Sequence, residues 1–371
     1  MEENFQRFDL EVPRPPLPTA VIIGKDILRN IPDAIDLSGY TQFVIVIEDQ
    51  LRVPFGSKLE EGLRKTGKSL NIFTSEGSEL NKTEKEADRI INNILTIEPQ
   101  IDRKLAVFAV GGGVIGDVAG YCAGRTLRGV DIFQVPTTLL AMVDSSLGGK
   151  TAVDHGGIKN KIGSFHLPRA TIMDTDVLKS LPERQITSGF AEFVKHAFLD
   201  PEIFKFISGE NARTIMDNGD KLIEGLKLSA KYKMSIVGQD YEEKTGIRQV
   251  LNFGHTLGQA IEAAAGLEKL THGEAVAIGM AGIILMSNEL KMLSDQDKEI
   301  MLGTMKRFNL PTSTSRIVDI DRKLLWKIIA QDKKAINGVP KFVLPEGVGR
   351  FKVGCSVDKE IVNHALDLIA P

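Results

Sequence analysis

The chain has 371 residues, of which 42% are hydrophobic and 26% charged, a balance typical of globular proteins and a length that suggests two domains. Its formal net charge of −3 argues against nucleic-acid binding, which requires a basic excess or a basic stripe. With two cysteines, no apolar run of membrane-spanning length and no signal-peptide pattern, we expect a cytoplasmic protein without a disulfide framework.

The first half alternates short apolar runs with amphipathic segments. Strands are expected at 8–12, 19–24, 43–47, 70–73, 105–110 and 169–174, and helices at 51–66 and 83–97. This alternation predicts a doubly wound parallel sheet, which binds its ligand at the carboxyl ends of its strands. Asp49 follows one such end and suits the hydroxyls of a nucleotide ribose, although strand-end acids are also common without a function.

A triple-glycine turn, Gly111 to Gly113, follows the apolar run 105–110, and we expect a helix to begin near residues 116–119. Glycines let a backbone approach a phosphate closely, and the free N–H groups of a first helical turn attract anions. From these residues alone, a phosphate site and a plain tight turn with close strand-helix packing are equally good interpretations.

From residue 183 the pattern becomes helical, with helices expected at 188–207 and 212–237. We therefore divide the chain into an α/β domain, residues 1–178, and an all-helical domain, residues 179–371, with the site between them. The polar residues of 248–262 are spaced four, three, four and three, which places them on one face of a single, mostly buried helix, although a solvated polar face is the alternative. These residues are Arg248, Asn252, His255, Gln259 and Glu262.

His255, His272 and Glu192 would together form a two-histidine, one-carboxylate set, which suits a catalytic divalent metal ion with an open coordination position. None of the three pairs has the close spacing of a standard zinc motif, so structural histidines remain an alternative. Lysines in apolar or glycine-rich settings form a second group. If several of them meet, they would bind a substrate with more than one negative group, whereas each alone is compatible with an ordinary surface position. They are Lys150, Lys159, Lys161 and Lys195.

These motifs resemble the 3-dehydroquinate synthase family, within the wider sugar phosphate cyclases. The matching stretches are GGGVIGDVAG at 111–120, Arg128-Gly129, QVPTTLLAMVDSSLGGKTAV at 134–153, Lys159-Asn160, IGSFHLP at 162–168, AEFVKH at 191–196, LNFGHT at 251–256 and HGEAVAIGM at 272–280. The resemblance implies a Rossmann-like NAD-binding domain, a helical metal-binding domain, a homodimer, and conversion of 3-deoxy-arabino-heptulosonate 7-phosphate to 3-dehydroquinate and phosphate in the shikimate pathway.

The resemblance also assigns residues, position by position. It implies that Glu192, His255 and His272 bind a divalent metal, zinc or cobalt. It places NAD on Asp49, Glu79, Lys82, Gly111, Gly112, Gly113, Asp117, Thr137 and Thr138, with Asp144, Lys150 and Lys159 close by. It lines the substrate with Asp144, Lys150, Lys159, Asn160, Lys195, Lys233, Glu243, Arg248, Asn252, Gln259 and one of Lys333 and Lys334, preferably Lys334. Arg128 would reach a phosphate across the dimer interface.

Two positions depart from the family pattern. Gln259 stands where the family usually has a second histidine, and Ile158 stands where a glycine is usual. A related cyclase that acts on sedoheptulose 7-phosphate or another sugar phosphate, such as glucose 6-phosphate, is therefore an alternative, although Arg248 suits a carboxylate that those substrates lack. Two different function classes also stay open, namely a metal-dependent polyol dehydrogenase, which would release NADH, and a non-catalytic nucleotide-binding regulator.

Overall fold

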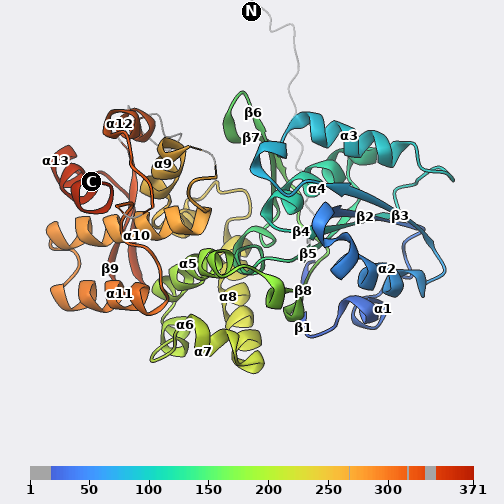
Figure 1. Ribbon diagram of the computed structural model, residues 1–371, viewed down its shortest axis with the longest axis horizontal. Helices are drawn as coiled ribbons and strands as arrows, with labels where there is room; N and C mark the ends of the chain where they lie inside the picture. Colours follow the sequence, from blue (N-terminus) through green and yellow to red (C-terminus); the bar gives the residue numbers. More distant parts are fainter. Residues whose placement is uncertain (1–17, 267, 316, 331–339) are drawn as a thin grey trace, which may run out of the picture.

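The computed structural model describes residues 18–266, 268–315, 317–330 and 340–371. An α/β half and a helical half lie side by side, with a small β-hairpin between them at the top of Figure 1. The strand expected at 8–12 and both Lys333 and Lys334 fall outside the described residues.

Six parallel strands form the sheet of the first half, which confirms the predicted α/β class. Their spatial order is β1 (Ala20–Gly24), β8 (Ala170–Asp174), β5 (Asp131–Pro136), β4 (Leu105–Gly111), β2 (Gln42–Glu48) and β3 (Ser69–Ser75). Alternate side chains of β2 enter two separate apolar clusters, Phe43 and Ile45 on one face of the sheet and Val44 on the other. Helices therefore cover both faces, as the alternating pattern predicts.

The helices of this half are α1 (Ile31–Ala34), α2 (Ser57–Arg64), α3 (Glu84–Leu95) and α4 (Gly113–Arg125). Two expected boundaries were wrong. The helix predicted at 51–66 begins as a π-type turn at Arg52–Gly56 that contains Pro54, which has no N–H to donate, and the α-helix starts only at Ser57. The helix expected near 116–119 already begins at Gly113, because Gly112 adopts an extended conformation suited to the N-cap position.

An antiparallel hairpin, which the sequence pattern did not predict, joins β6 (Lys150–His155) to β7 (Ile158–Phe165). Its tip consists of Gly156 and Gly157, whose φ angles of 59° and 75° lie in the left-handed region that glycine adopts easily. The hairpin projects between the two halves and carries several of the expected site residues.

The second half is helical, as predicted. Its helices are α5 (Glu183–Leu199), α6 (Pro201–Phe206), α7 (Ala212–Met216), α8 (Gly219–Gln239), α9 (His255–Ala265), α10 (His272–Glu289), α11 (Asp295–Arg307), α12 (Arg322–Ala330) and α13 (Lys359–Ile369). The segments expected as single helices are broken at Asp200 and at Asn218, because each side chain caps the helix that follows it. The half also contains a hairpin of β9 (Phe342–Gly347) and β10 (Arg350–Cys355), so it is not all-helical.

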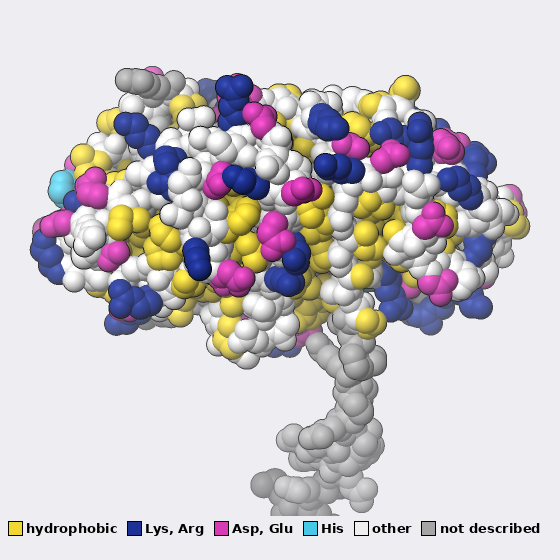
Figure 2. Space-filling model, turned by 90° about the horizontal axis from the view of Figure 1, so that it is seen from below, with side chains coloured by type: hydrophobic (Ala, Val, Ile, Leu, Met, Phe, Trp, Pro, Cys, Tyr) yellow, Lys and Arg dark blue, Asp and Glu magenta, His cyan; other side chains and the backbone are white. Residues whose placement is uncertain are grey.

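One cluster of buried apolar side chains continues from the sheet into the helical half, which fixes the two halves against each other. On the face shown in Figure 2, Lys and Arg side chains alternate with Asp and Glu side chains, in keeping with the small net charge. In the described part of the chain, no helix combines the length and the apolar character required to cross a membrane.

Candidate functional site

The glycine turn lies at the carboxyl end of β4, directly before α4. A Cβ atom on Gly111 would come within 2.7 Å of Ile115, and one on Gly113 within 3.0 Å of Ser145 Oγ, so side chains have little room here. Thr137 donates its backbone N–H to Gly111 O at 3.0 Å, which joins the ends of β4 and β5. The turn thus combines close packing with the exposed N–H groups of a helix start, the geometry that binds anions.

A buried lysine joins this turn to the hairpin. Lys82 Nζ donates to Asp117 Oδ2 on α4 and to Asn160 Oδ1 on β7, both at 2.6 Å. Burial lowers the pKa of Lys82, but the carboxylates of Asp117 and Glu79 outweigh burial and raise this pKa above its usual value. Asn160 has a φ of 52°, an uncommon conformation for a residue other than glycine. The structure therefore brings these expected residues together in one hydrogen-bonded group.

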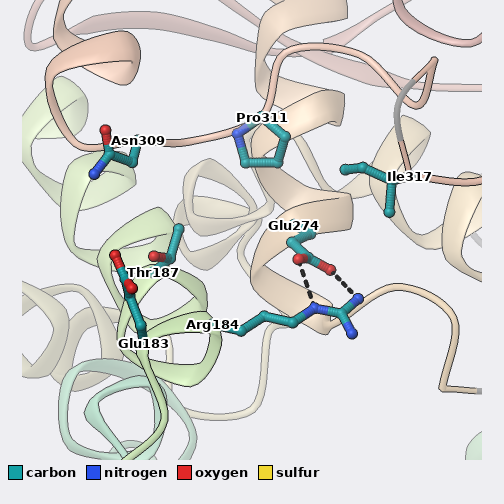
Figure 3. Close-up of a pocket in the computed structure, with 7 residues that line it drawn as sticks. All are labelled: Glu183, Arg184, Thr187, Glu274, Asn309, Pro311 and Ile317. Atoms are coloured by element: carbon teal, nitrogen blue, oxygen red, sulfur yellow. Dashed lines mark hydrogen bonds and ion pairs between the residues drawn. The ribbon is translucent and has the colours of Figure 1, made fainter.

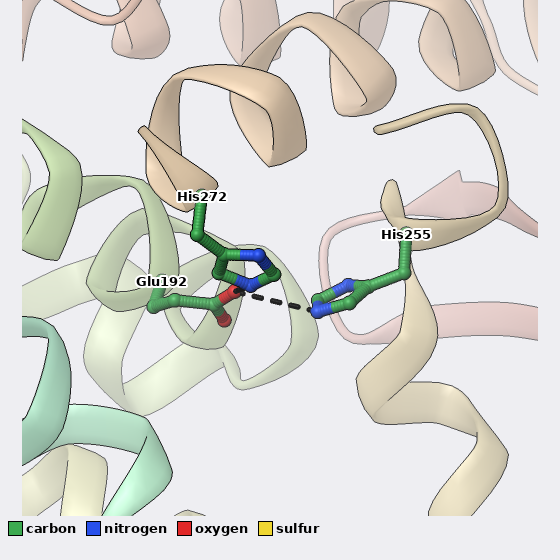
Figure 4. Close-up of side chains that lie close together, drawn as sticks. All are labelled: Glu192, His255 and His272. Atoms are coloured by element: carbon green, nitrogen blue, oxygen red, sulfur yellow. Dashed lines mark ion pairs between the residues drawn. The ribbon is translucent and has the colours of Figure 1, made fainter. Parts of the chain in front are cut away.

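Glu192 of α5 meets His255 and His272, the first residues of α9 and α10 (Figure 4). Its Oε1 lies 3.5 Å from His255 Nε2 and 3.4 Å from His272 Nε2. Glu192 is fully buried, its Oε2 forms an ion pair with Lys195 Nζ, and among the described residues its Oε1 has no hydrogen-bond partner of normal geometry. Two imidazole nitrogens converge on a buried carboxylate oxygen, and these three ligand-type atoms fit a divalent metal ion.

The three residues of this set have pKa values that are shifted in different directions. Burial opposes ionisation of Glu192, but Lys195 outweighs it and lowers the pKa of the carboxyl below its usual value. Burial also lowers the pKa of His255 to about 3. For His272, burial acts in the same direction, but the carboxylates of Glu192 and Glu262 outweigh it and raise the pKa to about 10. Two carboxylates next to His272 thus favour a positive charge at this position.

The start of α10, which carries His272, is held firmly. Arg184 of α5 donates two hydrogen bonds, at 2.8 and 2.7 Å, to the carboxylate of Glu274, while Glu274 and Thr271 form a capping box at the start of α10 (Figure 3). A Cβ atom on Gly273 would lie 2.0 Å from Ser188 O, so only glycine permits this approach of α10 to α5. The surface cavity of about 400 Å³ in Figure 3 lies beside this clamp.

Cationic groups stand beside the metal-ligand set. Lys233 Nζ of α8 lies 2.7 Å from Asp144 Oδ1, and Lys195 Nζ lies 4.0 Å from the same oxygen. Asp144, Glu192 and His196 also place three ligand-type atoms close together. Asp144 already faces two ammonium groups, whereas the set with His255 and His272 offers two imidazole nitrogens, so that set is the better candidate for a metal ion.

Arg248 occupies a position that the sequence did not anticipate. A 3-10 segment, Ile247–Asn252, carries it, and Gly254, with a φ of 81°, separates this segment from α9. The expected single helix over 248–262 was therefore wrong, because the chain turns at Gly254, where a Cβ would lie 2.5 Å from Met280. Arg248 is nonetheless buried, donates to Tyr241 O and Gly148 O, and lies 3.9 Å from Glu243.

Lys159 of the hairpin connects the two halves. Its Nζ donates to Glu262 Oε1 of α9 at 2.6 Å and lies 3.6 Å from Glu79 Oε1. Glu262 Oε2 in turn lies 3.3 Å from His272 Nδ1. Sequence reasoning placed Glu262 on the polar face but gave it no role, and its spacing of seven residues from His255 was the signal available.

The remaining predicted site residues differ in their contacts and in their exposure to solvent. Lys150 pairs with Glu243 at 2.7 Å, and Thr138 packs against Gly112. Asn252 is half-buried at the end of its 3-10 segment. Lys150, Asp49 after β2 and Arg128, with a φ of 67°, are exposed. Gln259 in the second turn of α9 is exposed as well, which departs from the buried polar face expected for that segment.

A parallel-sheet half with an anion-binding turn, facing a helical half with a metal-ligand set and buried lysines, defines a two-domain enzyme for anionic small molecules. The chain belongs to the 3-dehydroquinate synthase family. Residues 72–188 match the family model described as 3-dehydroquinate synthase N-terminal, and residues 189–335 match the one described as 3-dehydroquinate synthase C-terminal.

Individual relatives agree with this membership. The 3-dehydroquinate synthase of Xylella fastidiosa is 37% identical over 358 residues, 94% of this chain and 89% of the relative. That of Thermodesulfovibrio yellowstonii is also 37% identical, over 84% of this chain and 86% of the relative. In fold, the chain is similar to 2-epi-5-epi-valiolone synthase from Streptomyces hygroscopicus, solved with NAD⁺ and Zn²⁺ bound, with a TM-score of 0.86, 24% identity, and coverage of 97% of this chain and 99% of that one.

Proposed function

We propose that this protein is a phosphate-eliminating carbon-oxygen lyase that converts 3-deoxy-arabino-heptulosonate 7-phosphate to 3-dehydroquinate and phosphate. The observation that carries the proposal is the convergence of Glu192, His255 and His272 beside the buried amines of Lys195 and Lys233. A metal-ligand set next to several cations suits a polyhydroxylated, multiply charged substrate. Membership of the 3-dehydroquinate synthase family supports the same reaction.

Two cofactors belong to this proposal. We assign a divalent metal, zinc or cobalt, to Glu192, His255 and His272, and NAD to the glycine turn and its surroundings. The NAD group comprises Asp49, Glu79, Lys82, Gly111, Gly112, Gly113, Asp117, Thr137 and Thr138. When bound, NAD accepts and returns a hydride and the metal ion acidifies the substrate hydroxyls, while the side chains described above hold the substrate in place.

The remaining polar residues would hold the substrate. Arg248 offers a planar fork for the substrate carboxylate, and its burial strengthens such a pair. The other members of the proposed substrate site are Asp144, Lys150, Lys159, Asn160, Lys195, Lys233, Glu243, Asn252 and Gln259, with Lys334 from the undescribed segment. Because these groups fix charge and geometry, they lower the barrier mainly by orientation and electrostatic stabilisation.

A direct assay tests this function. The purified protein is incubated with NAD⁺ and Zn²⁺ or Co²⁺ and with each candidate sugar phosphate, and both phosphate release and the carbocycle are measured. We expect the heptulosonate to yield equal amounts of phosphate and 3-dehydroquinate without net NADH. Preference for sedoheptulose 7-phosphate would indicate a related cyclase, whereas stoichiometric NADH without phosphate would indicate a polyol dehydrogenase. Nucleotide binding without any turnover would favour a regulator.

We also propose a homodimer in the cytoplasm, with a domain boundary at residues 178 and 179. Exposed Arg128 suits a contact with a second copy of the chain, and the two free cysteines suit a reducing compartment. The boundary falls within the 3-10 segment Thr175–Ser180, between β8 and α5. Sedimentation velocity tests the dimer, since a monomer at catalytic concentrations would contradict the role of Arg128.

A further inference from the structure

The carboxylate of Glu262 divides its two oxygens between two partners. Oε1 accepts a hydrogen bond from Lys159 Nζ at 2.6 Å, and Oε2 lies 3.3 Å from His272 Nδ1. The side chain is only 14% exposed, which shields both contacts from water. A solvent-facing glutamate on a helix would not hold a separate partner on each carboxylate oxygen. The geometry therefore points to a specific role for Glu262.

One of these contacts determines which nitrogen of His272 faces the metal-ligand set. A carboxylate accepts but does not donate, so His272 Nδ1 donates to Glu262, which leaves Nε2, 3.4 Å from Glu192 Oε1, as the nitrogen that a metal ion would take. His255 has the same orientation, with Nδ1 lying 3.3 Å from Phe253 O and Nε2 facing Glu192. Both imidazoles therefore present Nε2 to one point.

The other contact leads to the nucleotide half. Lys159 precedes Asn160 on β7, and Asn160 Oδ1 accepts a hydrogen bond from Lys82, which also binds Asp117 on α4. Polar contacts, joined through the adjacent hairpin residues Lys159 and Asn160, thus lead from α4, next to the glycine turn, to Glu262 and His272. Glu262 is the member that touches both the hairpin and a metal-ligand candidate.

We propose that Glu262 is a positioning residue that orients His272 for the metal ion and couples metal binding to NAD binding through Lys159 and the hairpin. The proposal rests on the proposed function, because it requires a metal ion on Glu192, His255 and His272. Such coupling is reciprocal, so each ligand should strengthen the binding of the other by the same factor.

The test uses the full chain with Co²⁺ and NAD⁺ as probes, and compares Glu262→Gln and Glu262→Ala with the wild type. The alanine variant removes both contacts, and we expect it to weaken Co²⁺ binding by about 10–100-fold and to change the visible spectrum of bound Co²⁺. The glutamine variant can still accept from His272 but loses the charge that holds Lys159, so its Co²⁺ affinity should fall less. In the wild type we expect Co²⁺ to tighten NAD⁺ binding by about 5-fold or more, and both variants should lose this factor.

Glu289→Gln is the matched control, because Glu289 pairs with His364 Nδ1 at 2.8 Å on the surface, also from a helix of the second half. It should change neither Co²⁺ binding nor the coupling, and circular dichroism of all variants checks that the fold persists. A wild type that binds no Co²⁺ would refute the proposed metal site itself. If the wild type binds Co²⁺ while both Glu262 variants retain its affinity within about 3-fold, its spectrum and the coupling to NAD⁺, then the role of Glu262 is wrong and the proposed function stands.

Discussion

Replacing Lys233 by methionine removes the ammonium that faces Asp144 inside the protein while keeping most of the side-chain volume. Lys233 is 5% exposed, and its Nζ lies 2.7 Å from Asp144 Oδ1, whereas Lys195 Nζ lies at 4.0 Å. At an effective dielectric constant of about 20, these distances correspond to attractions of roughly 6 and 4 kcal/mol. Asp144 would therefore keep about two fifths of its attraction to these two amines after the substitution.

Breaking a buried pair costs about 3–5 kcal/mol in general, and the remaining Lys195 places this case at the low end, near 3 kcal/mol. Urea unfolding followed by the fluorescence of Trp326, the one tryptophan of the sequence, measures the effect. With an m-value of about 3 kcal/mol/M, the midpoint should fall by about 1 M. Trp326 packs against the same apolar cluster that contains Leu226 of α8, so its signal reports on this region.

Lys227→Met is the matched control on the same helix. Lys227 Nζ lies 2.9 Å from Glu224 Oε2, but the two side chains are 48% and 45% exposed. A pair so open to solvent contributes about 0.5 kcal/mol or less. Equal shifts of the midpoint in the two variants would refute the argument that burial of the Lys233–Asp144 pair stabilises the fold.

Three further outcomes are expected. Arg248→Ala should lower kcat/KM for the heptulosonate by about 30-fold or more in steady-state kinetics, with only partial recovery in Arg248→Lys, and a wild type that prefers sedoheptulose 7-phosphate would contradict the carboxylate role. His272→Ala should abolish both bound metal and turnover with an intact fold, and full occupancy by metal analysis would remove His272 from the ligand set. Burial raises the pKa of Cys122 to about 12, so little of this thiol is ionised at about pH 8. Iodoacetamide should therefore label Cys355 but not Cys122, and labelling of Cys122 in the folded protein would contradict its burial.

The sheet was largely predictable because its signals are local. Buried parallel strands are short apolar runs, so β2, β4 and β8 were found within one residue at each end. The glycine turn was predicted from three consecutive glycines that follow an apolar run. The hairpin β6–β7 was missed because its strands are partly polar and β7 contains Gly163, and such segments acquire their structure from the elements they contact.

The candidate site depends on contacts between residues that are far apart in the chain. The spacing of residues along the sequence does not reveal such contacts. Glu192, His255 and His272 come from three different helices, so their residue types suggested a metal-ligand set but their spacing in the sequence could not show that they meet. The polar spacing of 248–262 was misleading, because a 3-10 segment and a turn at Gly254 replace the expected continuous helix. Glycine at 254 permits both the left-handed turn and the close approach to α10, and those two demands override helical periodicity.

The order of strands in the sheet constrains when this half can fold during synthesis. β1 pairs with β8 in register, Gly24 opposite Asp174, and the Asp174 carboxylate accepts hydrogen bonds from the backbone of Asp26 and Ile27. At translation rates of about 5–20 residues per second, roughly 8–30 s separate the emergence of these two strands from the ribosome. Until residue 174 has emerged, β1 lacks its partner strand, and its unpaired backbone groups and apolar side chains stay open to contacts with other chains.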